Sequence, residues 1–216
     1  MKKYKLIGFD MDGTLCHSVI SFDEIFEQAF GIKKSTVEGV WMGALQAEEA
    51  RTGIEAIRAI FPDLAEVRVE EYLHEFSHLW ARNLKLFRGV VAMLDGLRAS
   101  GVKLTLITNG PSVMQHVVID YLGIRDCFDM AFTTGDEVLG INKPNRACFD
   151  RVAQLMDVEA EDCLFIGDGE VNDYRGAQSA GWDALWVKVS DDQNQPKLSD
   201  LAVSGDQESP YMVSWS

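Results

Sequence analysis

Leu6-Ile7-Gly8-Phe9-Asp10-Met11-Asp12-Gly13-Thr14 is the stretch of this 216-residue chain that decides the fold. Its first four residues are apolar or small, which is typical of a short strand buried on both faces of a sheet. Two aspartates follow at once, and Gly13 allows a turn directly after them. Carboxylates held this close raise one another's pKa unless a cation or a shared proton compensates. The stretch therefore predicts a buried strand that delivers an acidic pair for metal-assisted or acid/base chemistry.

Later apolar runs repeat the pattern of a buried strand. They are Leu104–Thr108, Met130–Phe132, Cys163–Ile166 and Ala184–Val187. Helical patterns lie between them, and each ends before a glycine suited to a left-handed C-terminal position; they are Val91–Ser100, Val113–Leu122 and Val171–Ala180, with Gly101, Gly123 and Gly181 after them. Ser112 is the predicted N-cap of the second helix. Strands that alternate with helices predict an α/β fold with a doubly wound parallel sheet.

The connection between the first two strands is much longer than one helix requires. Capping-box patterns predict three helix starts in it, at Ser21-Phe-Asp-Glu24, Ser35-Thr-Val-Glu38 and Thr52-Gly-Ile-Glu55, and a fourth helix is predicted over 66–84. Four inserted helices predict an all-helical cap domain over the carboxyl edge of the sheet. We therefore expect an α/β core at 1–15 and 87–190, a helical cap at 16–86, and a C-terminal tail at 191–216. Tyr211 and Trp215 are the residues that could pack this tail on the core.

Composition argues against several classes of partner. The formal charge of −14 and the pI near 4.6 disfavour nucleic acid polymers and anionic membranes, both of which attract basic surfaces. No apolar stretch approaches the length of a membrane span. The four cysteines are scattered without a C-x-x-C pair, which is typical of free thiols in a reducing compartment. We therefore expect a cytoplasmic protein that acts on a small molecule.

Polar side chains follow several of the predicted strands at the point where each strand ends, and Lys143-Pro144 precedes the helix before the fourth strand. In chain order the candidate residues are Asp10, Asp12, Thr108, Asn109, Lys143, Asp168 and Asp173. Because the carboxyl ends of parallel strands meet at one edge of a sheet, these side chains are expected to lie close together. Four carboxylates, a hydroxyl and an amine suit a hard cation with oxygen ligands that holds a phosphoryl group.

These motifs match a known family. Asp10-x-Asp12-Gly-Thr14, Thr108-Asn109, Lys143-Pro144 and Gly167-Asp168…Asn172-Asp173 resemble, in order and approximate spacing, the four motifs of the haloacid dehalogenase (HAD) superfamily. The resemblance extends from about Lys5 to Val187, and the insert is similar to the helical C1-type cap. It implies that Asp10 is a nucleophile forming an aspartyl-phosphate, and that Asp12 is the general acid and then the general base.

The resemblance also implies a ligand set. Mg²⁺ would be held by Asp10, by the main-chain carbonyl of Asp12 and by Asp168, with Asp173 as a further ligand or support. The phosphoryl oxygens would be held by Thr108, the Asn109 amide and Lys143. Asp12 further favours phosphate chemistry, because family members that cleave carbon–halogen bonds generally lack this second aspartate.

The function expected from this resemblance is Mg²⁺-dependent hydrolysis of a small phosphomonoester, such as a nucleotide, a sugar phosphate or phosphoglycolate. Asn145 after Lys143-Pro144 is similar to the nucleotidase-like branch, while Gly169 departs from the serine that is common after Gly-Asp. An alternative is a phosphomutase, which requires a site for a second phosphate. We identify no such site in the cap, whose basic residues include Lys33, Lys34, Arg51 and Arg58.

Two other interpretations are weaker. A phosphorylatable receiver-type signalling module is also acidic and α/β, but it is shorter and carries its phosphorylated aspartate after a later strand. His74-Glu75-Phe76-Ser77-His78 fits the H-E-x-x-H zinc pattern, yet the sequence offers no recognisable third ligand. Trp41 and Met42 are more simply explained by packing inside the cap than by contact with substrate.

Overall fold

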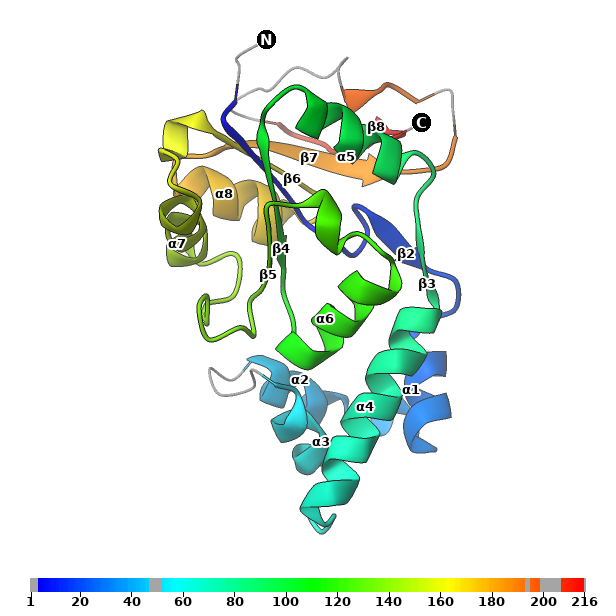
Figure 1. The fold of residues 1–216 in the computed structure, drawn as a ribbon. Coiled ribbons are helices and arrows are strands. Elements are labelled where there is room, and N and C mark those ends of the chain that lie inside the picture. The colour runs from blue at the N-terminus through cyan, green and yellow to red at the C-terminus, as the bar shows by residue number, and fades with distance from the viewer. Residues whose placement is uncertain (1–3, 47–51, 193–194, 199–206, 216) are drawn as a thin grey trace.

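A six-stranded parallel sheet forms the centre of the protein in the computed structural model, which describes residues 4–46, 52–192, 195–198 and 207–215 (Figure 1). The strands lie in the order β5-β4-β1-β6-β7-β8. Their bounds are β1 (Leu6–Phe9), β4 (Lys103–Thr108), β5 (Met130–Thr133), β6 (Cys163–Gly167), β7 (Asp183–Val189) and β8 (Tyr211–Val213). β1 pairs with β4 on one side and β6 on the other, so the strand order reverses at β1. Such a reversal opens a crevice beyond the carboxyl ends of the strands.

The five strands predicted from apolar runs are all present, with small shifts at their ends. Sequence reasoning missed β2 (Cys16–Ser18), β3 (Leu84–Leu86) and β8. Each of these has three residues, which is too short for a hydrophobic period to be recognised.

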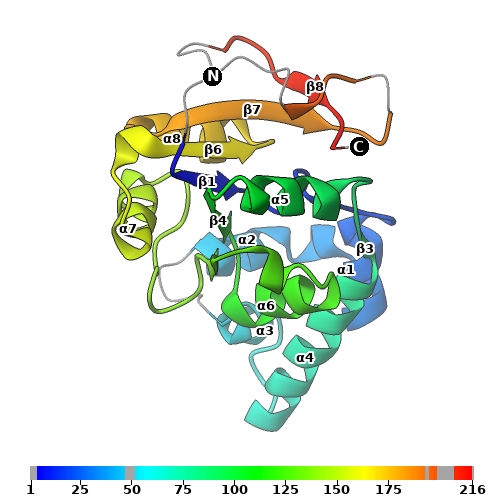
Figure 2. The same ribbon diagram turned by 45° about the horizontal axis from the view of Figure 1, so that its top comes forward.

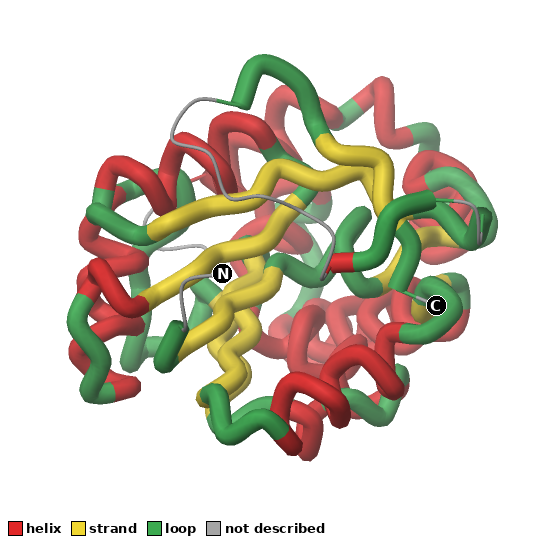
Figure 3. The backbone as a smooth tube through the Cα atoms, turned by 90° about the horizontal axis from the view of Figure 1, so that it is seen from above, coloured by secondary structure: helices red, strands yellow, loops and turns green. Residues whose placement is uncertain are grey.

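Helices cover both faces of the sheet, as the view along it shows (Figure 3). The helices α5 (Val90–Ala99) and α6 (Ser112–Tyr121) pack on one face, and α7 (Arg146–Met156) and α8 (Gly176–Ser179) pack on the other. In β1, Ile7 belongs to the first of these cores and Leu6 to the second. This two-sided burial explains the nearly continuous apolar runs and confirms the predicted doubly wound fold.

The helix ends confirm part of the prediction. Gly101, Gly123 and Gly181 all have the positive φ expected of a left-handed C-terminal position. The prediction that Ser112 is an N-cap is wrong, because Pro111 occupies that position with extended backbone and Ser112 is the first helical residue. The pattern over 171–180 is not one α-helix. It divides into a π-helical turn, Glu170–Arg175, followed by α8.

A helical insertion connects β2 to β3, two short strands that pair antiparallel beside the core. Its helices are α1 (Phe22–Phe30), α2 (Glu38–Gln46), α3 (Ile54–Ile60) and α4 (Glu66–Arg82). Trp41 is 1% exposed and packs edge-on against Phe26 and Phe76, so it is a core residue as expected, whereas Met42 is exposed. α4 also packs along α6, which joins the insertion to the α/β core (Figure 2).

Of the three capping boxes predicted in the insertion, one is confirmed, one is wrong and one is incomplete. Ser21 forms the predicted capping box, with both reciprocal hydrogen bonds present. The prediction at Ser35 is wrong, because this residue lies in the 3₁₀ turn Lys34–Thr36 ahead of α2. At Thr52 the box is incomplete, since Gly53 takes the N-cap position.

The end of the chain contacts the centre of the sheet. β8 pairs in parallel with β7. Beyond it, Trp215 is buried, packs edge-on against Phe9, and donates an indole hydrogen bond of 2.8 Å to the main-chain carbonyl of Thr14. The last residues thereby hold the turn that follows β1.

Two further observations concern the cysteines and the apolar character of the helices. All four cysteines are buried, and none forms a disulfide bond with another, as predicted. Within the part of the chain that the structure describes, no helix has both the length and the apolar character needed to cross a membrane.

Candidate active site

A cleft of about 310 Å³ opens at the carboxyl ends of β1, β4 and β6. Its lining consists of Asp10, Asp12, Thr108, Asn109, Lys143, Asp168, Gly169, Asn172 and Asp173. Every candidate residue predicted from the sequence is in this group. Strand order therefore places at one edge side chains that are far apart in the chain.

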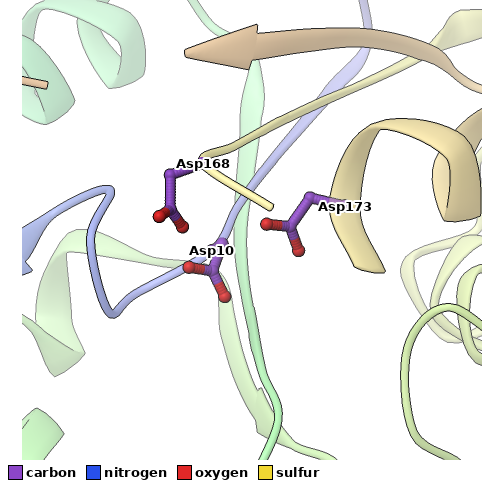
Figure 4. A group of neighbouring side chains, drawn as sticks. All are labelled: Asp10, Asp168 and Asp173. Carbon is purple, nitrogen blue, oxygen red and sulfur yellow. The ribbon is translucent and has the colours of Figure 1, made fainter. Parts of the chain in front are cut away.

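Three carboxylates converge in the cleft (Figure 4). Asp10 follows β1, Asp168 follows β6, and Asp173 comes from the π-helical turn. One oxygen from each lies within 4.8 Å of the others. The Asp12 carboxylate is outside this group, because it faces α6, where Gln115 donates to its Oδ2.

Two glycines make room for these carboxylates. Gly13 has φ of +84°, and a Cβ placed there would lie 2.5 Å from Asp168 Oδ2. A Cβ on Gly167 would lie 2.5 Å from the side chain of Asp173. A larger residue at either position would therefore displace a carboxylate of the cleft.

Lys143 is the cation of this cluster. Its Nζ lies 2.7 Å from Asp10 Oδ1 and 2.6 Å from Asp173 Oδ1, and the residue is 3% exposed. The Asn109 carboxamide anchors the Lys143 backbone, accepting from its N–H and donating to its carbonyl at 2.9 Å each. Asp173 also accepts from the main-chain N–H of Gly169 at 2.8 Å, which connects the lysine to the loop after β6.

Gln115 is a site residue that sequence reasoning missed. Its Nε2 lies 2.9 Å from the Asn109 carbonyl, 3.0 Å from Thr108 Oγ1 and 3.3 Å from Asp12 Oδ2. One feature of the sequence could have indicated it: Gln115 is a polar residue on the buried face of α6, next to the apolar Val118 and Ile119. A single glutamine in such a stripe does not identify its partners, so only the structure could find them.

The charges in the cleft are unequal, with four aspartates facing one lysine. Burial raises the pKa of Asp10, of Asp12 and of Asp168 above the ordinary carboxyl value. Burial also disfavours the Lys143 ammonium, but the carboxylates of Asp10 and Asp173 more than offset this and raise the pKa of the lysine. A divalent cation among the three converging carboxylates would favour their ionised forms. The donor set, which is entirely oxygen, fits such an ion.

The histidines of the H-E-x-x-H pattern are elsewhere. His74 and His78 are exposed on α4, with ring centroids 4.4 Å apart, and neither lines the cleft.

Comparison with known proteins gives two kinds of relative. The family profile of haloacid dehalogenase-like hydrolases matches residues 4–181. A phosphoglycolate phosphatase from Pectobacterium atrosepticum is 30% identical over 185 residues, which cover 81% of this chain and 76% of that protein.

Solved structures share the fold at lower sequence identity. A HAD phosphatase from Thermococcus onnurineus superposes with a TM-score of 0.63 at 22% identity, covering 98% of this chain and 94% of that one. A 2-haloacid dehalogenase from Pseudomonas syringae pv. Tomato DC3000 gives a TM-score of 0.66, also at 22% identity and with the same coverage of both chains. Because a phosphatase and a dehalogenase superpose about equally well, the fold alone does not determine the reaction.

Proposed function

The chain belongs to the haloacid dehalogenase-like hydrolases, and we propose that it is a Mg²⁺-dependent phosphatase of small phosphomonoesters. One observation carries the proposal. Asp10 lies beside Lys143 and the other two converging carboxylates, while Asp12 lines the same cleft outside that cluster. Two aspartates from one turn thus have different surroundings, as a nucleophile and a separate acid/base require.

The cleft suits a magnesium ion. We assign Asp10, Asp168 and the main-chain carbonyl of Asp12 as its protein ligands. Asp173 has both oxygens in hydrogen bonds, to Lys143 and to Gly169, and we assign it chiefly to supporting the site. When bound, the ion would neutralise charge on the phosphoryl oxygens.

The reaction has two steps on this chain's residues. In the first, a carboxylate oxygen of Asp10 forms a bond to phosphorus while the bond from phosphorus to the substrate's alcohol oxygen breaks. Asp12 gives its proton to that departing oxygen. In the second, Asp12 takes a proton from water, the water oxygen bonds to phosphorus, and the bond to Asp10 breaks to release phosphate.

Charge repulsion opposes the first step. A carboxylate and a phosphate oxygen at 4 Å repel by about 4 kcal/mol per charge pair at an effective dielectric of about 20. Lys143 lies against the nucleophile and offsets part of this repulsion. The Thr108 hydroxyl and the Asn109 main-chain N–H are the proposed donors to the phosphoryl oxygens, because the Asn109 carboxamide is already bound to the Lys143 backbone.

The helical insertion, residues 16–86, is the proposed cap over the cleft. A space of about 310 Å³ accommodates a small phosphorylated metabolite, such as a nucleotide, a sugar phosphate or phosphoglycolate. A cytoplasmic location agrees with the proposed substrates and with the free thiols.

The test is phosphate release from a panel of these phosphomonoesters, with Mg²⁺ and with a chelator. We expect Mg²⁺-dependent release from at least one substrate. Asp10→Asn should reduce turnover to background, whereas Asp63→Asn, an exposed aspartate of the insertion, should leave it unchanged. No release from any member by the wild-type protein would contradict the phosphatase proposal, and full activity of Asp10→Asn would exclude Asp10 as nucleophile. An isomerised product without free phosphate would indicate a mutase instead.

A further inference from the structure

The side chain of Gln115 lies behind the cleft and contacts three of its components. It is 6% exposed, and its amide nitrogen is within hydrogen-bond distance of Asp12, Thr108 and Asn109. Two of these acceptors, the Asn109 carbonyl and the ionised form of Asp12, cannot donate in return. If the amide were turned over, its oxygen would face both of them, so the donor orientation is the one that the chemistry requires.

The carbonyl half of this amide differs from the amino half. Gln115 Oε1 is buried without a hydrogen bond among the described residues. Burying an unpaired carbonyl destabilises a fold, and the neighbouring inward positions of α6 are the fully buried Val118 and Ile119. An apolar residue would suit this position better if packing were its only role. The site also accommodates the amide closely, because a Cβ on Gly110 would lie 3.0 Å from the Gln115 side chain.

The hydrogen bonds of Gln115 have consequences for two reacting groups. Thr108 Oγ1 accepts from Gln115, which leaves the hydroxyl hydrogen available to donate toward the cleft that Thr108 lines. Asp12 Oδ2 also accepts from Gln115, which leaves Oδ1 as the oxygen for proton exchange. Asp12 Oδ1 itself has a weak contact with the Cys16 thiol at 3.9 Å.

We propose that Gln115 is a positioning residue that holds the Asp12 carboxyl group ready to protonate the leaving group and orients the Thr108 hydroxyl toward the phosphoryl group. The inference rests on the proposed phosphatase function. It adds to that function a group on α6 that sets the geometry of proton transfer without touching the substrate.

Leaving-group chemistry tests the role toward Asp12. An alkyl phosphomonoester needs its departing oxygen protonated, whereas p-nitrophenyl phosphate releases a stable phenolate and needs little help. We would compare kcat/KM for both substrates in wild type and in Gln115→Met, which keeps the side-chain volume but lacks the donor. We expect the alkyl ester to lose roughly tenfold or more beyond the loss for the aryl ester. Effects through Thr108 are common to both substrates and cancel in this ratio.

Controls separate positioning from folding. Val118→Ala removes buried volume one turn along α6 without touching the amide, so it should lower the thermal midpoint and leave the ratio of the two kcat/KM values unchanged. Gln115→Asn retains a donor on a shorter side chain and should restore part of the ratio. In an Asp12→Asn background, Gln115→Met should change the ratio no further, because the group that it positions has gone.

The outcomes are distinguishable. An equal loss for both substrates in Gln115→Met overturns the role toward Asp12, and no loss for either substrate overturns the positioning role altogether. If Gln115→Met does not fold, the same ratio measured on Gln115→Asn, alone and in the Asp12→Asn background, decides the question. Wild-type protein that releases phosphate from neither substrate nor any other phosphomonoester of the panel, with Mg²⁺ present, contradicts the proposed function itself.

Discussion

At the scale of single residues, the site depends on the ion pairs that Lys143 forms with Asp10 and Asp173. Its ammonium is buried between Asp10 and Asp173, and both partners are themselves buried. A buried ion pair adds little net stability over an apolar replacement of both partners, but removal of one partner leaves uncompensated charge. The lysine is therefore needed by the fold as well as by the proposed chemistry.

Replacing Lys143 by methionine should consequently destabilise the protein, by about 3–5 kcal/mol at neutral pH without divalent cations. Urea unfolding at pH 7 in the presence of a chelator measures this loss. Lys5→Met is the matched control, since Lys5 forms an exposed pair with Asp162 and should change stability little. Equal stability of wild type and Lys143→Met at pH 7 would contradict the buried-pair interpretation.

At the scale of elements, the C-terminal segment supports two loops of the cleft. Trp215 donates to the carbonyl of Thr14, in the turn that carries Asp10 and Asp12. The main-chain N–H of Gln207 donates to the hydroxyl of Tyr174, in the π-helical turn that carries Asp173. Through these two hydrogen bonds, residues 207–215 connect the turn that carries Asp10 and Asp12 to the turn that carries Asp173. None of the proposed catalytic residues lies in 207–215.

We expect Trp215→Phe to retain the aromatic contact with Phe9 but to leave the Thr14 carbonyl without its indole donor. An unpaired buried carbonyl costs about 1–3 kcal/mol, which for a chain of this size lowers the thermal midpoint by about 2–4 °C per kcal/mol. Phosphatase kcat/KM should fall as well, because the turn that carries both aspartates loses a support. Met212→Ala, at an exposed position of β8, should affect neither quantity. A lower midpoint with unaltered kcat/KM would show that the tail stabilises the fold without positioning the turn.

At the scale of the whole molecule, acidic residues outnumber basic ones both in the chain as a whole and in the cleft. The chain carries a formal charge of −14, and the cleft itself holds four aspartates and one lysine. Burial raises the pKa of Asp10 to about 8 against an ordinary value of 3.8. At pH values between these two pKa values, Asp10 in the folded protein therefore holds a proton that it has already released in the unfolded chain.

The sign of the pH dependence follows. Where the folded state binds more protons than the unfolded state, stability falls as pH rises, by at most about 1.4 kcal/mol per pH unit for each proton. Thermal midpoints measured in a chelator should accordingly fall from pH 5 to pH 8. Mg²⁺ should raise the midpoint more at pH 8, because it binds the ionised carboxylates. Asp168→Asn should largely remove the Mg²⁺ effect. A Mg²⁺ effect equal at both pH values would contradict the assignment of these carboxylates as ligands.

The sequence by itself determined the parallel sheet and the candidate residues of its edge. Buried strands require continuous apolar runs, and parallel strands bring their carboxyl ends together, so Asp10, Lys143 and Asp168 could be assigned to one edge from order alone. Local signals also predicted the capping box at Ser21 and three left-handed glycines. These features depend on neighbours in the chain or on a periodic pattern, both of which a sequence displays.

Only the tertiary structure decided which side chains meet. That Lys143 bridges Asp10 and Asp173, that Gln115 reaches Asp12, and that Trp215 holds the turn after β1 all join residues distant in the chain. Such contacts depend on the angles at which helices and loops approach the sheet, and those angles come from packing between elements rather than from the order of residues within any one of them.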